Sequence, residues 1–103
     1  MIVRTWQGRA AKARPDDYKR HFEGAVLPEL HRLSGFLGAM LLRRETADDL
    51  EIMVITRWTS LDAIKGFAGE NYERAVVEPG AVAALVSFDD TVTHYEVIAG
   101  EDA

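Results

Sequence analysis

Residues 36–59 read FLGAMLLRRETADDLEIMVITRWT. Two β-rich runs, 36–45 and 50–59, flank a polar turn at 47–49, and this pattern predicts a β-hairpin. Apolar side chains occupy both alternating faces of the two strands. By residue parity we expect one face to present Met40, Leu42, Ile52, Val54 and Trp58, and the other Leu37, Ala39, Leu41, Met53 and Ile55. Both faces of this hairpin therefore need to be covered.

The segment before the hairpin predicts one strand and one helix. Residues 2–8 alternate and are rich in β-formers, which is typical of a strand. A helix is expected to begin at 15–17, where a proline precedes two acidic residues that suit the positive end of the helix dipole. Pro28 is expected to interrupt this helix, because the residue before a proline is pushed out of the α region. A short second helical piece over 29–33 then leads into the hairpin.

The segment after the hairpin predicts a second helix and a closing strand. Ser60 is placed to cap a helix that ends near Gly69. Residues 81–86 are compatible with another short helix, and 91–99 predicts the last strand. The order βαββαβ predicts an α+β, ferredoxin-like domain over residues 1–103 with a four-stranded antiparallel sheet.

The two-sided hairpin also predicts an assembly. Two helices cover only one face of a four-stranded sheet, so the other face would leave several large apolar side chains in water. That exposure costs on the order of 10 kcal/mol, against a total stability of about 5–15 kcal/mol. We therefore expect a homodimer in which two sheets pack face to face.

Composition excludes several classes of protein. Twelve basic against 17 acidic side chains give a net charge of −5, which disfavours nucleic-acid binding. The absence of cysteine excludes disulfides, a thiolate nucleophile and a Cys-ligated metal. The three histidines lack metal-ligand spacing, so no metal site is expected. The longest apolar run, 52–55, is far too short to span a membrane, and the expected location is the cytoplasm.

Four side chains of the outer strands are candidates for a site. If the first and last strands pair so that residue numbers sum to about 100, Arg4 lies opposite Glu96 and Trp6 opposite His94. All four then share one face of the sheet. One interpretation is a cross-strand ion pair beside an aromatic contact. The other is a pocket wall in which His94 titrates near neutral pH and Glu96 influences its pKa.

Aromatic residues around the end of the hairpin are further candidates. Trp58 is either a core anchor or a group whose indole N–H donates to a substrate oxygen. Phe67 and Tyr72 would complete an aromatic pocket beside it.

The stretch Arg57-Trp58-Thr59-Ser60-Leu61-Asp62-Ala63-Ile64 and the aromatic residues that follow it resemble the antibiotic biosynthesis monooxygenase family of dimeric α+β barrels. The closing residues His94-Tyr95-Glu96-Val97 also resemble the end of small bacterial members. The resemblance implies the fold and the dimer, but it leaves the reaction open because the fold hosts several activities.

The resemblance suggests a cofactor-independent monooxygenase that acts on a small aromatic ligand of the quinol or anthrone class. His94 would assist deprotonation and Arg4 would stabilise the resulting oxyanion. Trp58, Trp6, Phe67 and Tyr72 would shape the pocket. The haem-degrading branch has an axial histidine where this chain has Val77, so haem is not expected.

Two other functions remain open. One is a non-catalytic ligand-binding or accessory protein, favoured if Arg4 and Glu96 form a closed ion pair. The other is a cyclase or isomerase relying on His94 and Tyr95, favoured if Tyr95 faces the same cavity.

Overall fold

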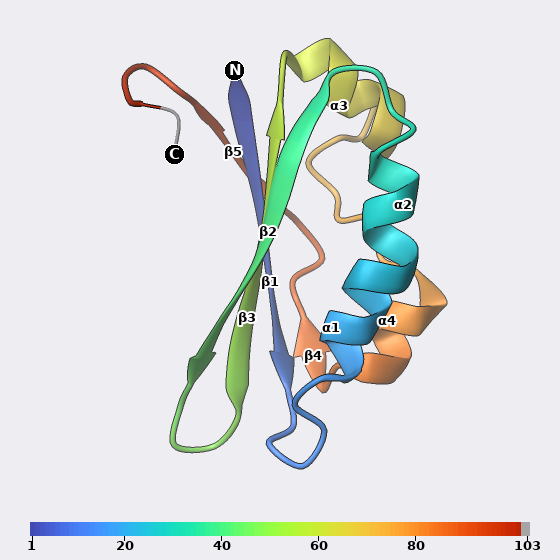
Figure 1. Cartoon of the computed structure of the whole chain (residues 1–103), viewed down its shortest axis with the longest axis vertical. Coiled ribbons are helices and arrows are strands. Elements are labelled where there is room, and N and C mark those ends of the chain that lie inside the picture. Colours follow the sequence, from blue (N-terminus) through green and yellow to red (C-terminus); the bar gives the residue numbers. More distant parts are fainter. Residues whose placement is uncertain (102–103) are drawn as a thin grey trace.

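In the computed structural model, which describes residues 1–101, the chain forms an antiparallel sheet with helices on one face (Figure 1). The strand order is β2-β3-β1-β4, and a further strand, β5, also pairs with β1. The expected α+β, ferredoxin-like arrangement is confirmed. The closing strand, predicted over 91–99, is the shorter β5 (Thr93–Glu96). A two-residue strand that was not predicted, β4 (Ser87–Phe88), precedes it and pairs with a different part of β1.

The centre of the sheet consists of β1 (Ile2–Ala10), β2 (Phe36–Glu45) and β3 (Leu50–Trp58). The predicted parity of β2 relative to β3 was wrong: Met40 pairs with Ile55, and Leu41 pairs with Val54. Opposite residues of an antiparallel pair share a face, so Ala39 and Leu41 pack toward the helices and Met40 does not. The turn between the two strands, residues 46–49, has four residues, so from Gly38 onward each even-numbered residue of β2 lies opposite an odd-numbered residue of β3, and the reverse.

The first helix is continuous where a break was predicted. It runs through α1 (Asp17–His21), the π-helical turn η1 (Phe22–Val26) and α2 (Leu27–Leu30) (Figure 1). Leu27 keeps helical angles (φ −58°, ψ −47°), and its N–H donates to the carbonyl of Phe22. The wider π turn accommodates the proline ring and the missing N–H donor of Pro28 without ending the helix.

The first helix after the hairpin begins and ends at its predicted capping residues. α3 (Leu61–Ala68) begins at Ser60, whose hydroxyl accepts a hydrogen bond from the N–H of Ala63 at 3.1 Å. It ends at Gly69, whose φ of 82° favours glycine. The short helix α4 (Pro79–Ala84) begins two residues before the predicted start.

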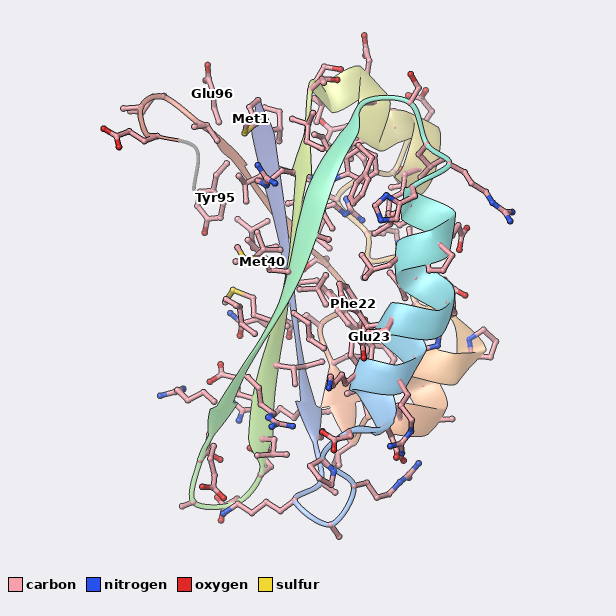
Figure 2. All side chains as sticks on the ribbon, viewed as in Figure 1. Met1, Phe22, Glu23, Met40, Tyr95 and Glu96 are labelled. Carbon is pink, nitrogen blue, oxygen red and sulfur yellow. The ribbon has the colours of Figure 1, made fainter. Side chains whose placement is uncertain are left out.

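The two faces of the sheet differ in exposure. The core lies between the sheet and the helices, and Trp58, Leu30 and Ile64 are its largest fully buried side chains. On the opposite face Met40 is 53% exposed and Tyr95 is 57% exposed. Figure 2 shows these two side chains pointing away from the helices. None of the helices in residues 1–101 is both long enough and apolar enough to cross a membrane.

Candidate functional site

A small cavity of about 60 Å³ lies between the sheet and the helices. Its wall includes Arg4 and Trp6 of β1, Tyr18 and His21 of α1, and Phe67 of α3. An apolar cavity of about 150 Å³ is known to hold benzene. A ligand with one aromatic ring therefore requires a modest outward shift of this wall, and a three-ring ligand requires a much larger one.

Arg4 provides the positive charge of the cavity. The residue is only 5% exposed, and its Nη1 donates to the carbonyl of Tyr72 at 2.6 Å. Nη2 donates to the carbonyl of Arg74 at 3.2 Å, and the guanidinium carbon lies 5.6 Å from the centre of the Phe67 ring. Burial lowers the pKa of Arg4 to about 10, so the group stays cationic at neutral pH.

The charge of Arg4 is not neutralised by a neighbouring acid. Within residues 1–101 its partners are carbonyl oxygens and an imidazole, and the ion pairs of the structure involve other arginines and lysines. The predicted ion pair with Glu96 is therefore wrong. Strands β1 and β5 pair two residues away from the expected register, so Arg4 lies opposite His94 and Glu96 lies opposite Ile2.

His94 holds Arg4 in place. Its Nε2 lies 3.0 Å from Nη1 of Arg4 and accepts the hydrogen bond, because a guanidinium can only donate. The proton of the neutral imidazole is then on Nδ1. Burial lowers the pKa of His94, the charge of Arg4 lowers it further, and Glu73 opposes both effects. The acidic neighbour that influences this pKa is thus Glu73 and not Glu96, which is exposed.

The two predicted tryptophans differ in position. Trp6 lines the cavity, and its Nε1 donates to the carbonyl of Asp89 at 2.7 Å. Trp58 is fully buried and lies outside the cavity lining. Its Nε1 donates to the hydroxyl of Thr56 at 2.8 Å, and its ring stacks on Phe67 at 5.6 Å.

The predicted residues thus separate into groups. Arg4, Trp6 and Phe67 line the cavity, whereas His94 and Tyr72 lie behind Arg4 and bind it. The rings of Tyr72 and His94 pack edge to face, with their centres 5.5 Å apart.

Two polar residues that α1 contributes to the cavity wall, Tyr18 and His21, were missed by sequence reasoning. Tyr18 is 4% exposed, and burial raises its pKa, with a further contribution from the charge of Glu78. His21, one turn after Tyr18, has a buried Nε2 with no hydrogen-bond partner in residues 1–101. The i, i+3 spacing of Tyr18 and His21 was the available signal, since it places both on one side of the helix.

The fold and the cavity define an α+β protein with a small, partly polar cavity between its sheet and its helices. The chain belongs to the antibiotic biosynthesis monooxygenase family, whose model matches residues 1–79. This confirms the resemblance identified from the sequence. No match to a curated protein sequence was found.

Solved structures share this fold at low sequence identity. An antibiotic biosynthesis monooxygenase homologue from Bacillus cereus has a TM-score of 0.68 and 19% identity, over 99% of this chain and 97% of that chain. SnoaB from Streptomyces nogalater, described as a cofactor-independent oxygenase, has a TM-score of 0.63 and 20% identity over 96% of this chain and 95% of its own. MhuD from Mycobacterium tuberculosis is described as a heme-degrader with two hemes bound in its active site. It has a TM-score of 0.62 and 21% identity, over 99% of this chain and 100% of that chain.

The MhuD structure corrects one expectation. Haem was not expected for a chain of this type, yet a protein of the same fold holds two haems in its active site. In the present chain Val77 packs against the helix-facing core, and a cavity of about 60 Å³ does not fit a porphyrin.

Proposed function

We propose that the protein is a monooxygenase-like enzyme that acts on a small aromatic hydroxy compound of the quinol or anthrone class, with residues 1–103 forming one functional domain. The observation that carries this proposal is the buried charge of Arg4, which lacks a carboxylate partner in residues 1–101 and lines an otherwise largely apolar cavity. A fixed, buried positive charge stabilises the oxyanion of a bound hydroxy compound. The small cavity volume favours one-ring quinols over anthrones.

In the proposed reaction, the substrate hydroxyl loses its proton to solvent, Arg4 holds the resulting oxyanion, and a proton is taken up again in the water that is formed. One oxygen atom of O₂ is inserted at a ring carbon beside the hydroxyl group, and the other oxygen atom leaves as water. The quinol ring supplies the electrons and becomes a hydroxyquinone. His94 acts as a positioning residue in this scheme, because its free electron pair is directed at Arg4. Trp58 supports Phe67 and Thr56 from the core side.

Oxygen consumption tests this proposal. The panel contains methylhydroquinone, a naphthohydroquinone and 1,8-dihydroxyanthrone, each assayed with and without added haemin so that a cofactor requirement is measured. We expect turnover above the uncatalysed rate with a quinol, and a loss of at least tenfold in Arg4→Gln. Arg32→Gln, at an exposed position, is the matched control. No turnover across the panel would reject the enzymatic function.

A non-catalytic ligand-binding function is the second candidate. It is supported by the three hydrogen bonds that already hold Arg4, which leave the group rigid and suited to binding. Saturable binding of a quinol with no oxygen consumption would select it. The cyclase or isomerase function loses its discriminating residue, because Tyr95 lies on the open face of the sheet (Figure 2).

We also propose that two copies associate through the open face of the sheet. Exposed apolar side chains gather there, among them Leu37, Met40, Leu42 and Tyr95. Sedimentation at micromolar concentration should give twice the mass of the 11.5 kDa chain. A stable, folded species at the mass of one chain would contradict this assembly.

A further inference from the structure

Tyr18 separates two hollows on the helix-covered face of the sheet. One is the cavity of about 60 Å³ that Arg4 and Trp6 line, and the other is a larger groove of about 400 Å³ between the first helix and strands β2 and β3. Among residues 1–101, Tyr18 is the one residue that lines both. Its side chain is buried, so the ring occupies the space between the two hollows and does not project into solvent.

The strand beneath the helix shows that the two hollows are neighbours. Val54 of β3 lines the cavity, and Ile52 of the same strand lines the groove. Residues two apart on a strand lie on one face with their Cα atoms roughly 6.5 Å from each other. Both pack in the same buried cluster as Tyr18. The cavity and the groove therefore lie over adjacent positions of one strand, with the Tyr18 ring between them.

Aromatic neighbours hold the Tyr18 ring in this position. On the cavity side, the ring centres of Trp6 and His21 lie 5.9 Å and 5.7 Å from that of Tyr18. On the groove side, the centre of the Phe22 ring lies 6.4 Å away. Because closely packed side chains leave few voids, the Tyr18 ring cannot swing aside without displacing one of these neighbours.

The groove offers an apolar surface beyond Tyr18. Its floor includes Phe22 of the helix, Leu41 of β2 and Ile52 of β3, and Figure 2 shows Phe22 at the side of the helix that faces the sheet. The positive charge of Arg43 at the rim is paired, since its Nη1 donates to Oδ1 of Asp16 at 3.1 Å. The groove is therefore suited to the apolar part of a ligand whose charged end lies elsewhere.

We infer that Tyr18 sets the upper size limit of the ligand: its ring closes the cavity of Arg4 against the groove, and a slimmer side chain at this position joins the two into one site for anionic ligands with several fused rings. This inference rests on the proposed use of the cavity as a ligand site and adds the residue that limits it. It does not require that the ligand be oxidised. An apolar cavity of about 150 Å³ holds benzene, and the groove exceeds that volume whereas the cavity alone does not.

Fluorescence titration with anthracene-2-carboxylate tests the inference. This probe has three fused rings in a row and a carboxylate at one end. We expect Tyr18→Leu to bind it at least tenfold more tightly than the native protein does, a gain that needs only about 60 Å² of newly buried apolar ligand surface. Excess benzoate should displace the probe, because both carboxylates then compete for Arg4 in the cavity.

Control variants assign the gain to position 18. Phe22→Leu removes a buried ring that lines the groove and not the cavity, so it should change the affinity for the probe less than threefold. Tyr18→Phe keeps the dividing ring and should behave in the same way. Adding Leu41→Trp to Tyr18→Leu fills the groove and should abolish the gain.

Circular dichroism establishes that each variant is folded, and Tyr18→Met provides a second slim side chain that is compatible with a helix. Four results would overturn the inference: no gain in a folded Tyr18→Leu or Tyr18→Met, an equal gain in Phe22→Leu, a gain that survives Leu41→Trp, or a probe that benzoate does not displace. The proposed enzymatic function fails by a different result, namely an absence of oxygen consumption with quinols while Tyr18→Leu still gains affinity for the probe.

Discussion

Trp58→Phe measures what the buried indole contributes to stability and whether it contributes to ligand binding. Trp58 is fully buried, so the smaller ring leaves a void of about 40 Å³, which costs about 1 kcal/mol at 24 cal/mol per Å³. The substitution also removes the hydrogen bond to Thr56, whose hydroxyl is then buried without its donor, and this adds about 1 kcal/mol. We therefore expect the free energy of unfolding to fall by about 2 kcal/mol.

Urea unfolding followed by circular dichroism measures this loss, and a thermal scan should show a Tm lower by about 8–16 °C. Calorimetry without oxygen, below the transition, should give a Kd for methylhydroquinone within twofold of the native value, because Trp58 lies outside the cavity. Trp6→Phe is the matched control, with a smaller loss of stability and clearly weaker binding. The reasoning is refuted if Trp58→Phe binds tenfold more weakly while the free energy of unfolding is unchanged.

Three further variants test other contacts. Because burial lowers the pKa of His94, the unfolded chain takes up its proton first as the pH falls below 6.5. Stability should therefore drop from pH 7 to about pH 5.5, and His94→Gln, which still accepts from Arg4, should flatten that part of the pH profile of urea unfolding; an unchanged profile contradicts this. Ser60→Ala removes the cap on the N–H of Ala63 and should lower the free energy of unfolding by about 1 kcal/mol in the same assay, with no loss counting against the cap. Met40→Glu should shift sedimentation toward the single-chain mass, and a retained dimer would place the interface elsewhere.

The order of elements could be predicted because it depends on local signals. The polar turn and the two β-rich runs identify the hairpin, and Ser60 and Gly69 mark the ends of α3 as expected. The pairing of strands was harder to predict. The register of β1 with β5 was two residues from the observed one, so the predicted face of Arg4 and His94 was correct while the predicted partner was not.

Of the residues that line the cavity, those on the sheet could be predicted from the sequence and those on the first helix could not. Alternation along β1 places Arg4 and Trp6 on one face, and the structure finds both in the cavity wall. The contribution of the helix depends on how α1 is rotated about its own axis, which depends on the π turn and on packing against α4. Tyr18 and His21 therefore could not be separated from ordinary core residues by spacing alone.

The π turn at Phe22–Val26 has a consequence for changes in chain length. An α-helix turns by about 100° per residue, so removing one residue rotates everything before the deletion relative to everything after it. Deleting Gly24, which is exposed and has open space around it, would convert the π turn to α-helix. Tyr18 and His21 would then rotate off the cavity wall while the sheet stays as it is. A one-residue insertion or deletion at this point is thus a route by which a protein of this family can exchange the polar groups of its binding site without altering a single strand.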